Sequence, residues 1–125
     1  MIIQLPGTVR APGAAREFVR ANLEAILPPG HSSLGDDLAL IVSELVTNSV
    51  RAEARTIEVE VRVDDERIEV HVTDDAGGWP TVQAATVDSL DGRGLEIVDQ
   101  LADSWRTESR ARGKSVIATR LRRPE

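Results

Sequence analysis

The chain has 125 residues, contains no cysteine and carries a formal net charge of −6 at pH 7. This length predicts a single domain, residues 1–125, that is large enough to bury a hydrophobic core. The absence of cysteine excludes disulfides and thiolate metal sites, and the acidic charge disfavours direct nucleic-acid binding. No apolar stretch is long enough for a membrane span, and the first residues lack a signal-peptide pattern, so we expect a cytoplasmic protein with no membrane contact.

Two helices are expected in the first half of the chain. Apolar residues recur at helical spacing over residues 12–26, and Pro12 suits a first helical turn. The Pro28-Pro-Gly30 segment ends this helix. A second helix is expected from about Ser33, whose hydroxyl can cap it, to position 52 or 53.

Strands are expected in the second half. Apolar and polar residues alternate over residues 57–63 and again over residues 68–72, with a turn at Asp64-Asp65, which predicts an antiparallel hairpin with one solvent-facing side. His71 falls on that side and is assigned no role.

The remaining segments complete the predicted fold. Residues 79–91 show no period and are interpreted as a mobile loop, and residues 95–102 predict a third helix. Residues 105–109 and 115–122 predict a closing hairpin around Gly113. The chain is therefore predicted to be an α+β two-layer sandwich, with a mostly antiparallel mixed sheet covered on one face by about three helices.

The first motif is Glu44-Leu-Val-Thr-Asn48 in the second predicted helix. Helical geometry places Glu44, Asn48 and Arg51 close together at the edge of the apolar stripe. A carboxylate and an amide oxygen suit Mg²⁺, which prefers oxygen ligands. Such spacings are also common among ordinary solvated helix residues, so the motif alone does not decide.

The second motif is Asp74-Asp-Ala-Gly-Gly78. Asp74 continues the inward parity of its strand, and a buried carboxylate needs a donor, which the amine of adenine would supply. Asp75 has the opposite parity and is the alternative reader of the base. An ordinary turn that contains Gly77 and Gly78 is the simpler interpretation of this segment alone.

The third motif is Gly92-Arg-Gly-Leu95, which places two glycines before the third predicted helix. Glycine lets the backbone approach a phosphate, and a helix N-terminus favours anions. The segment lacks the full dinucleotide-binding pattern, and it could equally be a plain turn into a helix.

Taken in order, the three motifs resemble those of the Bergerat-fold (GHKL, HATPase_c) ATPases. Within them the chain is similar to the small bacterial anti-sigma factor serine/threonine kinases of the actinobacterial stand-alone type. The similarity covers residues 5–7, 15–20, 43–51, 70–80, 92–98, 101–105 and 113–116.

The resemblance implies ATP and Mg²⁺ as cofactors and assigns roles to particular residues. Glu44 corresponds to the catalytic residue that orients or deprotonates the attacking hydroxyl, Asn48 to the Mg²⁺ ligand and Asp74 to the reader of adenine. The other implied ATP-binding residues are Arg51, Gly77, Gly78, Gly92, Arg93, Gly94, Leu95 and Ser115. Residues 79–91 correspond to the lid over ATP, which is short here.

The resemblance also implies partners. A kinase of this type sequesters a sigma factor and phosphorylates a serine on an anti-anti-sigma (STAS-domain) protein, and it can form a homodimer. Ala76 stands where the family has glycine. This departure leaves open a nucleotide-dependent regulatory binding module with little or no kinase activity. The detached catalytic domain of a histidine kinase is a third interpretation.

Overall fold

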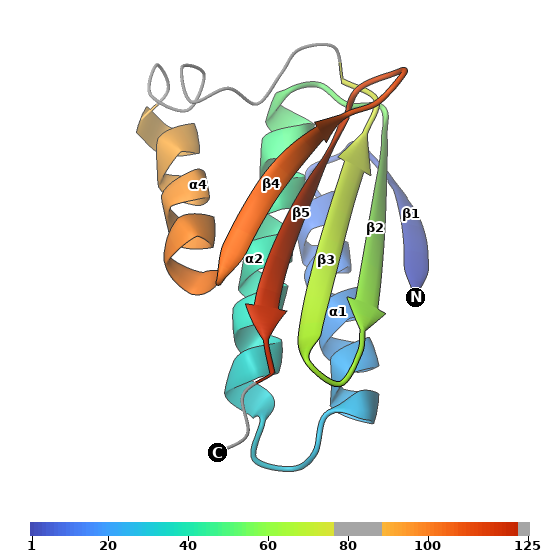
Figure 1. Ribbon diagram of the computed structural model, residues 1–125. Helices are drawn as coiled ribbons and strands as arrows, with labels where there is room; N and C mark the ends of the chain where they lie inside the picture. Colours follow the sequence, from blue (N-terminus) through green and yellow to red (C-terminus); the bar gives the residue numbers. More distant parts are fainter. Residues whose placement is uncertain (77–88, 123–125) are drawn as a thin grey trace.

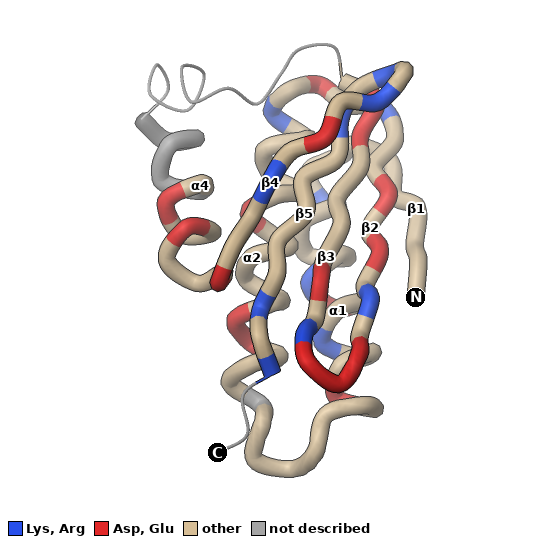
Figure 2. Tube along the Cα trace, in the orientation of Figure 1, with Lys and Arg blue, Asp and Glu red and all other residues tan. Residues whose placement is uncertain are grey.

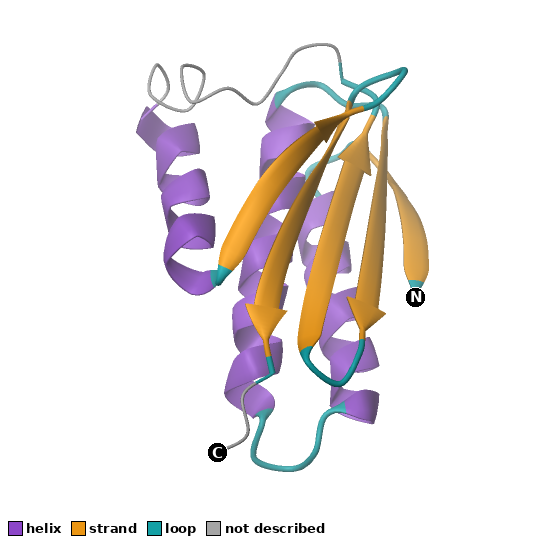
Figure 3. Cartoon of the chain, in the orientation of Figure 1, coloured by secondary structure: helices purple, strands orange, loops and turns teal. Residues whose placement is uncertain are grey.

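The computed structural model describes residues 1–76 and 89–122 of the chain. Its elements are β1 (Ile2–Pro6), α1 (Ala11–Ile26), α2 (Ser32–Arg51), β2 (Thr56–Val63), β3 (Arg67–Asp74), α4 (Ser89–Leu101), β4 (Ser104–Ser109) and β5 (Lys114–Leu121). The strands form one sheet in the order β1-β2-β3-β5-β4, and all four described pairings are antiparallel. The helices cover one face of this sheet (Figure 1, Figure 3). The predicted α+β sandwich is confirmed, with an antiparallel rather than a mixed sheet over the described strands.

The core lies between the sheet and the helices, and the period of two in the strands builds its sheet side. Val59 lies opposite Val72 and Val61 opposite Val70, and all four are at most 2% exposed. Val116 of β5 pairs with Val72 and extends the same layer. Successive side chains of a strand point to opposite faces, so the intervening polar residues lie on the outer face.

The helical side of the core comes from stripes spaced three or four residues apart. Ala15, Val19 and Leu23 of α1 are fully buried, as are Leu38 and Ile41 of α2. α2 packs against both α1 and α4, and it also contacts β2, β3 and β5. This central position brings the C-terminal part of α2 to the same end of the molecule as the end of β3 (Figure 1).

Two features of the first half differ from the sequence expectations. Helix α2 begins at Ser32, after His31, whose side chain makes no capping hydrogen bond. Ser33 lies inside the helix, so the predicted cap at this residue is wrong. The backbone N–H groups of Leu34 and Gly35 bond instead to the carbonyl of His31. Strand β1 was not predicted, because its five residues show too little alternation and become a strand only by pairing with β2.

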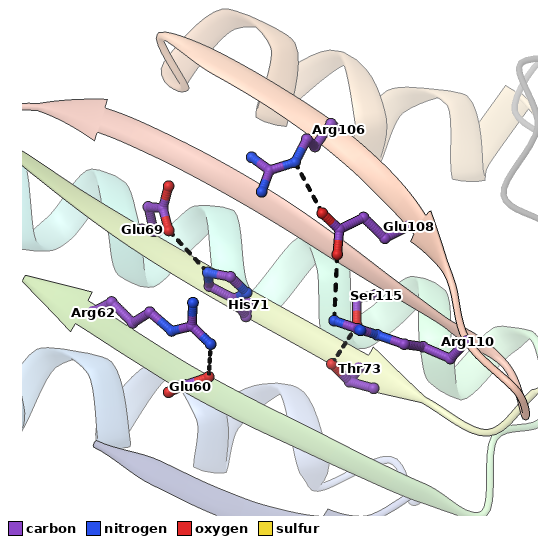
Figure 4. Close-up of polar contacts among 9 residues, drawn as sticks. All are labelled: Glu60, Arg62, Glu69, His71, Thr73, Arg106, Glu108, Arg110 and Ser115. Carbon is purple, nitrogen blue, oxygen red and sulfur yellow. Dashed lines mark hydrogen bonds and ion pairs between the residues drawn. The ribbon is translucent and has the colours of Figure 1, made fainter.

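The outer face of the sheet carries polar side chains that bond to one another (Figure 4). His71 pairs with Glu69 at 3.0 Å, and Arg62 with Glu60 at 3.0 Å. His71 lies on the outer face, as its strand parity predicts, but its side chain is only 8% exposed and has little contact with solvent. His71 sits on a central strand, where cross-strand neighbours such as Ile117 shield it from water.

Charged residues of both signs follow one another along the strands (Figure 2). In the described part of the chain, no helix combines the length and the apolar composition that crossing a bilayer requires.

Candidate functional site

The candidate site begins with the polar ridge near the end of α2. Glu44 and Asn48 lie one helical turn apart, and both are half-buried. Neither side chain makes a hydrogen bond or ion pair with another described residue. By contrast, the hydroxyl of Thr47 donates to the carbonyl of Ser43 within the helix. The oxygens of Glu44 and Asn48 are therefore available to a ligand, whereas the hydroxyl of Thr47 is already satisfied.

Asp74 ends β3 and points toward the helices, as its strand parity predicts. It is 4% exposed. Its Oδ2 accepts from the hydroxyl of Ser49 at 2.5 Å and from Nζ of Lys114 at 2.9 Å. Its Oδ1 accepts from Nζ of Lys114 at 3.1 Å and from the backbone N–H of Ala76 at 3.0 Å. A buried carboxylate needs such partners, and the chain itself supplies them here.

The bond from Ser49 to Asp74 joins two of the three sequence motifs. Ser49 directly follows Asn48 in α2, and Asp74 begins the second motif, 25 residues further along the chain. The structure therefore brings these two motifs together at one end of the molecule (Figure 1).

Gly113 positions Lys114 against Asp74. Gly113 has a φ of +85°, and a Cβ there would lie 1.9 Å from the backbone carbonyl oxygen of Asp74. Only glycine tolerates both this conformation and this close approach. Lys114 follows at once as the cross-strand partner of Asp74, so both side chains project to the same face.

Asp75, the alternative reader of the base, lies outside this cluster. It is exposed, and its Oδ1 accepts from the backbone N–H groups of Arg55 at 2.8 Å and Thr56 at 3.2 Å. The hydrogen bonds from Thr56 and Arg55 stabilise the ionised carboxylate and lower the pKa of Asp75 below the ordinary value of 3.8. Asp75 therefore anchors the start of β2, and Asp74 is the inward carboxylate.

Ser115, which the resemblance assigned to ATP binding, lies on the outer face of the sheet. Its hydroxyl bonds to that of Thr73 at 2.6 Å and accepts from Nε of Arg110 at 2.8 Å (Figure 4). The structure does not bring Ser115 to Asp74. Strand parity could have indicated this, because Val116 and Ala118 face the core and Ser115 alternates with them.

The glycines of the third motif lie inside a helix. α4 begins at Ser89, so Gly92, Arg93, Gly94 and Leu95 belong to its backbone, and the turn expected before the helix is not seen. Beyond its first turn, a helix uses its N–H groups for its own hydrogen bonds, so Gly94 and Leu95 do not offer theirs to a phosphate in this conformation. Glycine adopts helical angles readily enough for α4 to continue through both positions.

Other predicted site residues are placed as follows. Arg51 is exposed at the last position of α2, and Leu95 is half-buried. Gly77 and Gly78 lie outside the described residues, as does most of the segment interpreted as a lid, residues 79–88.

The described residues contain no group of three or more His, Cys, Asp or Glu side chains that could hold a metal ion. Mg²⁺ does not need such a cage, because it keeps several waters and shares ligands with phosphates. The amide oxygen of Asn48 and the carboxylate of Glu44, both unpaired within the described chain, suit this mode of binding.

Two residues of the cluster, Ser49 and Lys114, were not found from the sequence. Lys114 was detectable in principle: it is the only lysine in the chain, and it shares the inward parity of Val116 and Ala118. Ser49 gave no comparable signal, because its contact depends on how α2 packs against β3.

Comparison with known proteins gives one positive finding. The chain matches the model of the histidine kinase-like ATPase domain over residues 5–120. The search of curated proteins finds no match.

Proposed function

We propose, because the chain belongs to the histidine kinase-like ATPase domain family, that it binds ATP where the ends of α2 and β3 meet the start of β5. The observation that carries this proposal is the hydrogen bond from Ser49 to Asp74. It holds a buried, inward carboxylate against α2 at the residue that follows Asn48. The resemblance of both motifs to those of the family supports a single nucleotide site that includes both. In this proposal Asp74 faces the base, and Glu44 and Asn48 face the phosphates.

Magnesium would accompany ATP and neutralise phosphate charge, with Asn48 as a protein ligand. The half-buried amide of Asn48, which is unpaired within the described chain, supports this role.

We further propose that the protein is an anti-sigma factor serine/threonine kinase. The serine oxygen of a partner forms a bond to the γ-phosphorus while the bond from that phosphorus to the β–γ bridging oxygen breaks, and the serine proton passes to the carboxylate of Glu44. Support comes from the motif resemblance and from the unpaired, half-buried Glu44. The proposed partners are a sigma factor and an anti-anti-sigma (STAS-domain) protein, and the kinase itself can form a homodimer.

Titration calorimetry with Mg·ATP tests the binding site. Wild-type protein is expected to bind, and Asn48→Ala is expected to abolish binding because the metal loses its protein ligand. Thr47→Ala is the control: it truncates a neighbouring side chain whose hydroxyl bonds only within the helix. Retained affinity in Asn48→Ala would show that the site assignment is wrong.

The role of Glu44 is tested separately with γ-labelled ATP and a purified STAS-domain protein from the same organism. Glu44→Ala is expected to bind Mg·ATP with little change and to lose phosphotransfer by at least about a hundredfold, as for other proton-transfer residues. An unchanged rate would remove Glu44 from the mechanism.

The alternative function is a nucleotide-dependent binding module with little or no catalysis. Ala76 favours this alternative, because it stands in place of the family's glycine. Ala76 is only 4% exposed, and its backbone N–H donates to Asp74. The same labelling experiment distinguishes the two functions. Phosphoserine on the partner supports the kinase, whereas intact ATP in a stable complex supports the module.

A further inference from the structure

Lys114 is an unusual residue in this chain. It is the only lysine, and every other strongly basic side chain is an arginine. Its side chain is 7% exposed, and it forms an ion pair with Asp74, whose side chain is 1% exposed. A buried ammonium group is costly unless it is paired, so the ion pair with Asp74 accounts for the buried position of Lys114 in the structure.

The contacts of Asp74 leave its carboxylate with no free acceptor position. An ionised carboxylate offers about four lone-pair positions and no donor. Ser49, the N–H of Ala76 and two contacts from Nζ of Lys114 provide four hydrogen bonds. An exocyclic amine of a bound base therefore finds every acceptor position of Asp74 already taken.

The three donors to Asp74 differ in how easily they can leave. Ser49 carries its hydroxyl on a short side chain of helix α2, and the N–H of Ala76 belongs to the backbone two residues after Asp74. Lys114 carries its ammonium on a flexible four-carbon stem, which can move the charge toward water while the stem stays in apolar surroundings. Lys114 is therefore the donor that an incoming amine displaces.

We propose that Lys114 determines nucleotide specificity by competing with the amine of the base for Asp74. This inference rests on the proposed function, because it assumes that Asp74 faces the base. In the wild-type protein, the bond from the amine to Asp74 replaces the bond from Lys114, so the amine contributes little net affinity. In a variant that lacks the ammonium of Lys114, the carboxylate of Asp74 has one donor fewer, and the amine of the base supplies the missing hydrogen bond.

The first test uses the unmodified protein. Because the chain has one lysine, labelling with ¹⁵N-lysine gives a single side-chain ¹⁵Nζ resonance. We expect this resonance to shift on saturation with Mg·ATP and to stay in place with Mg·purine riboside triphosphate, which lacks the exocyclic amine. An unmoved resonance at saturating ATP, with binding verified by calorimetry, would overturn the competition.

The second test compares the affinities of the same two nucleotides for Lys114→Met. The variant keeps an aliphatic stem and removes the ammonium. We expect wild-type protein to discriminate weakly between them and Lys114→Met to prefer ATP by about a further tenfold, the typical effect of a hydrogen bond to a charged group.

Arg62→Met is the matched control, because it removes one positive charge from an exposed side chain that pairs with Glu60 on the outer face. It is expected to leave the preference unchanged. An equal preference in Lys114→Met and wild type would overturn the role of Lys114 while ATP binding stands. If wild-type protein binds neither nucleotide, the proposed function itself fails, and the inference fails with it.

Discussion

At the scale of single residues, the two adjacent aspartates show how position gives the same side chain different roles. Asp74 points inward and is held by Ser49 and Lys114, whereas Asp75 points outward and accepts from the backbone of β2. Their chemistry is identical, so the alternation of the strand alone separates them. The inward residue is the one suited to a ligand, and the outward one is suited to holding two strand ends together.

This difference predicts unequal effects of the same substitution. Asp74→Asn leaves the ammonium of Lys114 buried without an anion, and breaking a buried pair in this way destabilises a protein by about 3–5 kcal/mol. Asp75→Asn is the control, and we expect a much smaller loss, because an exposed amide oxygen can still accept from the same N–H groups. Urea unfolding measures both free energies, and equal losses would contradict the assignment of Asp74 as the buried partner.

At the scale of elements, glycines act in two opposite ways. Gly113 lies in the tight turn between β4 and β5 and brings the start of β5 against the backbone of Asp74. Gly92 and Gly94 do not break the chain, and α4 continues through them. A pair of glycines near a helix start therefore does not by itself determine whether the backbone turns or stays helical.

Gly113→Ala and Gly30→Ala test the close approach at the hairpin. Both glycines have positive φ, +85° and +93°, but a Cβ at Gly30 meets nothing within 4 Å. Gly30→Ala therefore measures backbone strain alone, about 1–2 kcal/mol. Gly113→Ala adds a collision with Asp74, so we expect a larger loss of stability in urea and weaker binding of Mg·ATP. Equal losses of stability in the two variants would mean that the β4–β5 hairpin moves away from Asp74 at no cost in free energy.

At the scale of the whole molecule, the fold places the candidate site at one end of the helix–sheet interface. α2 runs the length of the sheet between α1 and α4, so its last turns reach the end of β3 (Figure 1). The other face of the sheet is occupied by ion pairs and hydrogen bonds among its own side chains. A ligand held between α2 and β3 would bridge the two layers.

A ligand that bridges the layers binds the folded chain and not the unfolded one. Mg·ATP at about a hundred times its dissociation constant is therefore expected to stabilise the protein by about 2.7 kcal/mol and to raise its melting temperature. Differential scanning calorimetry measures this shift. Asn48→Ala is expected to show none, and an equal shift in that variant would place the nucleotide elsewhere.

The sequence by itself determined the element types, the inward parity of Asp74 and the family likeness, because these depend on local periodicity and on the order of short motifs. Only the tertiary structure decided that Lys114 and Ser49 meet Asp74, that β1 pairs with β2 and that α4 extends back to Ser89. Lys114 lies 40 residues from Asp74 in the chain. Their contact follows from the register between β3 and β5, which is set by packing across the whole sheet and not by any one segment.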